Sequence, residues 1–198
     1  VLDRGDALLG GEGDGALLVL PGPALPGEER AEHRGAVGMG AEPGHPAHGV
    51  AMLFQSPRRS VSPRMTLRQA IAEPLELRRR PAARTRRTVD AMADAVGLTP
   101  DLLRRRPAAV SDGQLQRAAL GRALIGEPQV LLADEVTAML DPATTASVVA
   151  LLRERVEEGL TVLTISHDAE LLARWCDRPG DRVLALADLT GDAGDGAA

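Results

Sequence analysis

Two apolar patterns alternate along the chain, one typical of amphipathic helices and one typical of buried strands. One helix face is marked by four apolar residues at i, i+3, i+4 and i+7 spacing, which are Val89, Met92, Ala93 and Val96. Short apolar runs predict strands at residues 50–54, 130–133, 161–166 and 182–187. The unbroken run at 130–133 predicts a strand buried on both faces, as in a parallel sheet. The pattern therefore predicts an α/β protein.

Polar residues mark where the helices begin. Ser111 and Gln114 have the spacing of a capping box, in which each side chain satisfies the backbone N–H of the other residue. The same spacing recurs at Thr66 and Gln69. Two further starts combine a capping residue with proline at the first helical position, at Thr99-Pro100 and Asp141-Pro142. Pro74 is expected to kink or divide the helix that begins at Thr66, and glycines are expected to end three of the helices, at Gly97, Gly126 and Gly159.

Composition narrows the class of protein. The chain has 198 residues and a net charge of −5, which gives no electrostatic support to a nucleic-acid partner. Cys176 is the single cysteine, so no disulfide can form within the chain, as expected in a reducing cytosol. No apolar run is long enough to span a bilayer, and no signal-peptide pattern opens the chain. The sequence contains no lysine, and we interpret its arginine-rich stretch at residues 78–87 as a solvated helix end and loop.

Two adjacent carboxylates, Asp134 and Glu135, follow the apolar run at 130–133. Burying two acids at the end of a strand is unfavourable unless a cation lies beside them. In open α/β sheets, ligands bind at the carboxyl ends of the strands. The sequence therefore predicts a magnesium-nucleotide at this point. Asp134 would hold the metal directly or through water, and Glu135 would orient or deprotonate a water molecule.

The block from Val110 to Asp141 resembles the signature motif, Walker B motif and D-loop of the ATP-binding-cassette (ABC) ATPases. The usual signature of that family is Leu-Ser-Gly-Gly-Gln, whereas residues 110–114 read Val-Ser-Asp-Gly-Gln, with two departures. Gln55 resembles the Q-loop glutamine of the family, and His167 resembles its switch histidine, because each follows a predicted strand in the expected order.

This resemblance implies a P-loop NTPase-like fold, in which a mostly parallel sheet is flanked by helices and carries an inserted helical subdomain. Residues 1–57 and 111–187 would form the nucleotide-binding core, and residues 58–110 would form the helical subdomain. Residues 188–198 are small and acidic, and they are expected to form a disordered tail.

The resemblance also implies a role for individual residues. Glu135, His167 and Gln55 would be catalytic, and Gln55 would help Asp134 to hold Mg2+. Four further residues would contact ATP, which are Ser111, Gly113, Gln114 and Asp141.

A glycine-rich stretch precedes these motifs. Gly10 and Gly15 have the spacing of a phosphate-binding loop, and the resemblance would place both on the nucleotide. Ala16 and Leu17 stand where that loop has Lys and Ser/Thr, so the loop would lack its charged and metal-binding contacts. A simple Gly-rich turn is the alternative interpretation. A phosphate loop in this stretch would lead into a helix. Pro21 would limit that helix to about one turn.

The resemblance implies an ATP-binding subunit that couples ATP binding and hydrolysis to solute transport through a separate transmembrane permease. Such a subunit would pair with a second ABC ATPase and lie on the cytoplasmic, inner face of the cell membrane. The segment Phe54-Gln55-Ser56-Pro57 is similar to the peptide and nickel importer branch. Two alternatives stay open, a pseudo-ATPase that completes the nucleotide site of a partner cassette and a cassette protein without a transport role.

Overall fold

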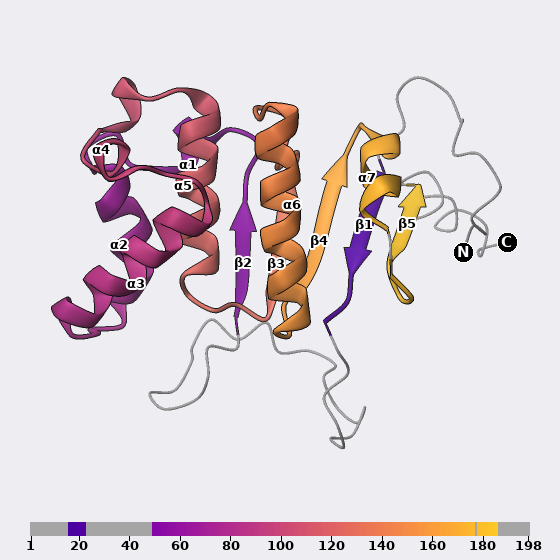
Figure 1. Cartoon of the computed structure of the whole chain (residues 1–198), viewed down its shortest axis with the longest axis horizontal. Coiled ribbons are helices and arrows are strands. Elements are labelled where there is room, and N and C mark those ends of the chain that lie inside the picture. The colour runs from indigo at the N-terminus through magenta and orange to yellow at the C-terminus, as the bar shows by residue number, and fades with distance from the viewer. Residues whose placement is uncertain (1–15, 23–48, 177, 186–198) are drawn as a thin grey trace, which may run out of the picture.

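The computed structural model describes residues 16–22, 49–176 and 178–185. Within these residues one sheet has the strand order β2-β3-β4-β1-β5 (Figure 1). The strands are β1 (Ala16–Leu20), β2 (Val50–Leu53), β3 (Val130–Asp134), β4 (Thr161–Ser166) and β5 (Arg182–Ala185). The helices are α1 (Pro57–Ser60), α2 (Leu67–Leu77), α3 (Ala82–Ala95), α4 (Pro100–Leu103), a 3-10 turn at Pro107–Ala109, α5 (Asp112–Leu124), α6 (Pro142–Glu157) and α7 (Ala169–Trp175).

Strands β2, β3 and β4 run parallel, which confirms the α/β fold predicted from the sequence. Leu53 pairs with Ala133, and Ala133 pairs with Thr164, so the three strands end at the same edge of the sheet. The residues that follow each strand are therefore delivered to that one edge. This register positions the candidate site.

Strand β1 corrects an expectation about the start of the chain. Ala16 and Leu17 begin an extended strand that pairs antiparallel with β4 on one side and with β5 on the other. A phosphate-binding loop leads into a helix, whereas Ala16–Leu20 form a strand. The structure does not support Ala16 and Leu17 as replacements for the Lys and Ser/Thr of such a loop. Gly10 and Gly15 lie outside the described residues, as does the tail predicted at 188–198.

Burial alternates along the strands. Leu131 and Ala133 are buried, whereas Val130 and Leu132 are only partly buried, so the prediction that this strand is buried on both faces is wrong. The buried face is covered by helices: α6 contacts β4, α7 contacts β1 and β5, and α5 contacts β2, and Figure 1 shows α6 and α7 in front of the sheet. No described helix covers the opposite face, where Met52 is 57% exposed.

Helices α1 to α4 gather beside β2, at one side of the sheet (Figure 1). The predicted capping box is present at the start of α2, where Thr66 and Gln69 satisfy each other's backbone N–H. Pro74 lies inside α2, which continues to Leu77, so the helix is not divided. The predicted apolar face of α3 is buried, and Gly97 ends this helix with a φ of 71°. The boundaries of a separate subdomain at 58–110 stay a prediction.

Helix α5 ends slightly before its predicted stop. Its last residue is Leu124, and the residue with a left-handed backbone is Glu127, at a φ of 53°, rather than Gly126. The backbone N–H of Glu127 donates to the carbonyl of Leu124, and the carbonyl of Gly126 accepts a hydrogen bond from Arg78 at 2.8 Å. A turn therefore ends α5, and the side chain of Arg78, which directly follows α2, holds that turn. Among the described residues, no helix has the length and apolar character needed to cross a membrane.

Candidate functional site

Glu135 turns the chain at the end of β3. It has a φ of 50°, a left-handed conformation that non-glycine residues seldom adopt. Its backbone N–H still donates to the carbonyl of Ile165 at 3.0 Å, which continues the pairing with β4. Unusual backbone conformations of this kind concentrate at functional sites. The turn directs the Glu135 carboxylate towards the end of β4.

Two donors at the end of β4 hold this carboxylate. The backbone N–H of His167 donates to Glu135 Oε1 at 2.7 Å, and the hydroxyl of Ser166 donates to Oε2 at 3.3 Å. Ser166 Oγ in turn accepts the backbone N–H of Asp168 at 3.1 Å, which fixes the direction of the hydroxyl. Each Glu135 oxygen keeps lone pairs for a further donor such as water. Ser166 was missed from the sequence, where its position directly before His167 is the only signal.

The His167 imidazole lies near Glu135 but contacts it less closely than the His167 backbone does. His167 Nε2 is 4.0 Å from Glu135 Oε1, and the side chain of His167 is 74% exposed, against 13% for Glu135. The imidazole is therefore free to reach a ligand from the solvent side. The structure thus places the Glu135 carboxylate and the His167 imidazole near each other at the end of β4.

Asp134 is the last residue of β3, Gln55 follows the neighbouring parallel strand β2, and both residues are exposed. Among the described residues, no group of three or more His, Cys, Asp or Glu side chains could hold a metal by itself. Carboxylate and amide oxygens nevertheless suit Mg2+, which keeps several waters and takes its other ligands from substrate phosphates. The donor set at this edge thus fits a metal that arrives with a phosphorylated ligand.

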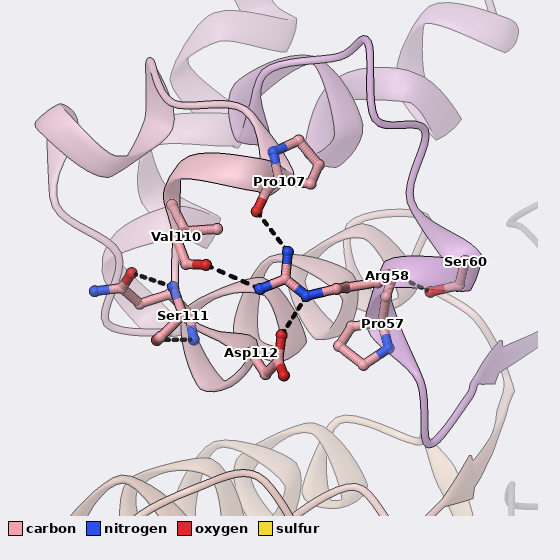
Figure 2. Close-up of polar contacts among 8 residues, drawn as sticks. Pro57, Arg58, Ser60, Pro107, Val110, Ser111 and Asp112 are labelled. Atoms are coloured by element: carbon pink, nitrogen blue, oxygen red, sulfur yellow. Dashed lines mark hydrogen bonds and ion pairs between the residues drawn. The ribbon is translucent and has the colours of Figure 1, made fainter.

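The residues predicted to contact ATP from α5 have clear structural roles. Ser111 is the N-cap of α5: its Oγ accepts the backbone N–H of Gln114 at 3.2 Å, and Gln114 Oε1 accepts the backbone N–H of Ser111 at 3.0 Å (Figure 2). Gly113 packs against the backbone after β3, since a Cβ atom there would lie 2.7 Å from the carbonyl oxygen of Met139. The start of α5 and the turn after β3 are therefore in direct contact.

Asp141 is the N-cap of α6, as predicted. Its Oδ1 accepts the backbone N–H groups of Ala143 and Thr144 at 3.1 and 3.0 Å, and Oδ2 accepts the Thr144 hydroxyl at 2.6 Å. These hydrogen bonds hold the pKa of the Asp141 carboxyl below its usual value. The bond from the Thr144 hydroxyl contributes most, and the backbone N–H groups contribute less. The side chain is committed to the cap, which stabilises its ionised form.

A cavity of about 1000 Å³ opens beside this site, between α6 and α7. Its lining includes Glu135, Ser166 and Asp168 together with apolar residues such as Leu171 and Trp175. Asp134, Gln55 and His167 do not line it. The cavity therefore reaches the Glu135 carboxylate from the side of the helices, and the exposed edge of the sheet is the better place for a metal-bound ligand.

Known proteins resemble this chain in sequence and in fold. The sequence pattern described as ABC transporter matches residues 24–138, which is more than half of the chain. The chain belongs to this family.

Two curated relatives and one solved structure show the degree of similarity. The oligopeptide transport ATP-binding protein OppF of Escherichia coli (strain K12) is 41% identical over 132 residues, which cover 65% of this chain and 40% of that protein. The methionine import ATP-binding protein MetN of Thermobifida fusca (strain YX) is 40% identical over 176 residues, which cover 88% of this chain and 47% of that protein. A dimeric ATP-binding cassette in a post-hydrolysis state with ADP and Pi bound is 29% identical with a TM-score of 0.59, over 65% of this chain and 56% of that chain.

The chain thus spans less than half the length of these two curated relatives. The structural similarity confirms the P-loop NTPase-like fold, with its sheet flanked by helices.

Proposed function

We propose that this chain is the ATP-binding part of an ABC importer subunit, which couples ATP hydrolysis to the uptake of a solute through a separate permease. The observation that carries the proposal is the Glu135 carboxylate, held by Ser166 and His167 at the edge of the sheet where Asp134 also lies. A carboxylate with a fixed direction and free lone pairs is suited to orient a water molecule and to accept its proton.

The remaining residues of the edge complete this chemistry. Asp134 and Gln55 would hold Mg2+, which neutralises charge on the phosphates when the nucleotide is bound. Glu135 would take the proton of the attacking water on Oε1 or Oε2. The exposed imidazole of His167 would hydrogen-bond the terminal phosphate or that same water.

The partners of the chain follow from the same proposal. The transported solute would cross a permease, and a second ATPase subunit would pair with this chain, which would lie at the inner face of the membrane. Relatives named for oligopeptide and methionine import support a peptide or amino acid as the solute. A nickel cargo stays a prediction from the sequence.

The pseudo-ATPase that completes a partner cassette stays the second candidate function. Ala16 and Leu17 lie in β1 rather than in a phosphate loop, and the sequence has no lysine that could contact the phosphates as such a loop does. We propose the active ATPase first because of the geometry at Glu135.

A substitution at Glu135 tests the proposal in the assembled transporter. Glu135→Gln keeps the shape of the side chain but cannot accept the proton, so ATP turnover should fall by about 10²–10⁴-fold while nucleotide binding persists. Glu76→Gln is the matched control, because Glu76 is exposed on α2, outside the site. Turnover at the wild-type rate in Glu135→Gln would refute the proposal.

A further inference from the structure

Arg58 connects two segments that are far apart in the sequence. It lies in α1, three residues after Gln55, and its side chain reaches the start of α5 (Figure 2). Its Nε donates to Asp112 Oδ1 at 2.6 Å. Its Nη1 and Nη2 donate to the carbonyl oxygens of Pro107 and Val110 at 3.0 and 3.2 Å. One guanidinium therefore binds one carboxylate and two carbonyls of the segment that leads into α5.

This set of contacts requires an arginine. A guanidinium presents its donors in a fixed plane, whereas the ammonium group of lysine is a compact point charge. Arg58 and Asp112 have side chains that are 46% and 47% exposed, and exposed ion pairs contribute little to stability. The two carbonyl contacts fix the direction of the guanidinium, so its charge stays on Asp112.

The position of Asp112 explains why its charge matters. Asp112 is the first residue of α5, between the N-cap Ser111 and Gly113, and it is one of the departures from the family signature noted in the sequence. The backbone N–H groups at the start of a helix favour an anion, such as the phosphates of a nucleotide. A carboxylate at the first helical position would repel the same anion, and a neighbouring guanidinium cancels that repulsion.

Two further contacts tie the Arg58 segment to α5. Gln116 Nε2 donates to the carbonyl of Phe54 at 3.4 Å, and Arg122 Nη1 donates to the carbonyl of Ser60 at 2.8 Å. The segment from Phe54 to Ser60, which contains Gln55, is therefore held along the length of α5. The charge of Arg58 stays beside Asp112 because the backbone that carries it is fixed to the same helix.

We propose that Arg58 is a positioning residue for nucleotide binding at the start of α5, where it neutralises Asp112 so that a triphosphate can approach. The inference rests on the proposed function and specifies one part of it, namely how this chain receives the nucleotide held by a second ATPase subunit. Because this role depends on charge, the effect of substituting Arg58 on nucleotide binding should depend on whether the Asp112 carboxylate is present.

A double-mutant cycle in the assembled transporter tests this dependence, with KM for ATP and kcat measured at several salt concentrations. Arg58→Met should raise KM about tenfold at low salt, and by less at high salt, because repulsion by Asp112 is screened. Asp112→Asn should lower KM, because the positive charge of Arg58 is then no longer compensated by a carboxylate. The double variant should return to within about threefold of wild type, because the charge that needed neutralising is gone. Arg58→Lys keeps the positive charge but cannot make all three contacts, so its KM should lie between those of wild type and Arg58→Met.

The outcomes separate this inference from the proposed function. Two results would show that Arg58 acts by holding the segment before α5: a double variant as impaired as Arg58→Met, or a change in KM that does not depend on salt concentration. Either result would overturn this inference and leave the proposed function standing. Loss of nucleotide affinity in Arg58→Lys equal to that in Arg58→Met would do the same. A wild-type transporter without ATP turnover would overturn the proposed function, and this inference with it. Thermal unfolding of each variant verifies that the chain is folded.

Discussion

The contact between Gly113 and Met139 gives a prediction whose size follows from the structure. Gly113 is the second residue of α5, and an added Cβ atom would lie 2.7 Å from the Met139 carbonyl oxygen and 3.5 Å from Leu140 Cδ2. Ordinary contact begins near 3.4 Å, so α5 and the turn after β3 would have to separate by about 0.7 Å. Both elements present backbone at this point, so no side-chain rotation can relieve the clash.

The expected cost combines two opposing effects. Overpacking costs about 1–3 kcal/mol, while replacing glycine by alanine within a helix gains up to ~1 kcal/mol. We therefore expect Gly113→Ala to lower the free energy of unfolding by about 1–2 kcal/mol. For a chain of this size, that change corresponds to a melting temperature lower by about 3–6 °C.

Gly121 in the same helix is the matched control. An added Cβ atom there meets side chains only, the nearest being Met92 Cγ at 3.3 Å. A methionine side chain adapts to such a contact at little cost, so Gly121→Ala should be neutral or stabilising by up to ~1 kcal/mol. Thermal and denaturant unfolding of both variants would measure the difference. A Gly113→Ala variant that melts at or above the wild-type temperature would refute the close approach of α5 to the Met139 carbonyl.

Three further predictions concern the cap of α6, a buried ion pair and the hydroxyl that holds Glu135. Folding lowers the pKa of Asp141 below its usual value of 3.8, so the ionised carboxylate stabilises the folded chain above pH 3.8, and this stability is lost as the pH falls through the folded-state pKa. The difference in melting temperature between wild type and Asp141→Asn should therefore be present at neutral pH and shrink below about pH 4. Arg153 and Asp181 form an ion pair at 2.8 Å, and their side chains are 9% and 5% exposed. Asp181→Asn should lower the free energy of unfolding by about 3 kcal/mol in denaturant titrations, because the buried charge of Arg153 is then less well compensated. A decrease of less than about 1 kcal/mol would contradict this prediction. Ser166→Ala should reduce kcat of the assembled transporter by about tenfold, with KM for ATP nearly unchanged, because the Glu135 carboxylate keeps one donor and loses the other; an unchanged kcat would show that the hydroxyl does not position Glu135.

Much of the candidate site could be predicted from the sequence because its position depends on local patterns. A carboxylate, a glutamine and a histidine each follow an apolar run, and parallel strands bring such positions to one edge. The capping residues were equally readable, since a cap joins residues only three positions apart. The structure confirmed the capping boxes at Thr66 and Ser111 and the cap at Asp141 for this reason.

The contacts that join distant segments could not be predicted in this way. Arg58 and Asp112 are 54 positions apart, and Glu135 and Ser166 are 31 positions apart, so no local spacing relates them. The antiparallel direction of β1 likewise depends on its partners β4 and β5 rather than on its own apolar residues.

The sequence by itself determined strands β2 to β5 and the capped starts of α2, α4, α5 and α6, because hydrophobic periodicity and capping act over a few residues. Tertiary structure alone decided which side chain holds Glu135, that Arg58 pairs with Asp112, and that one face of β3 is less buried than the other. These features depend on strand register and helix packing, which are set by contacts among segments that the chain brings together only when it folds.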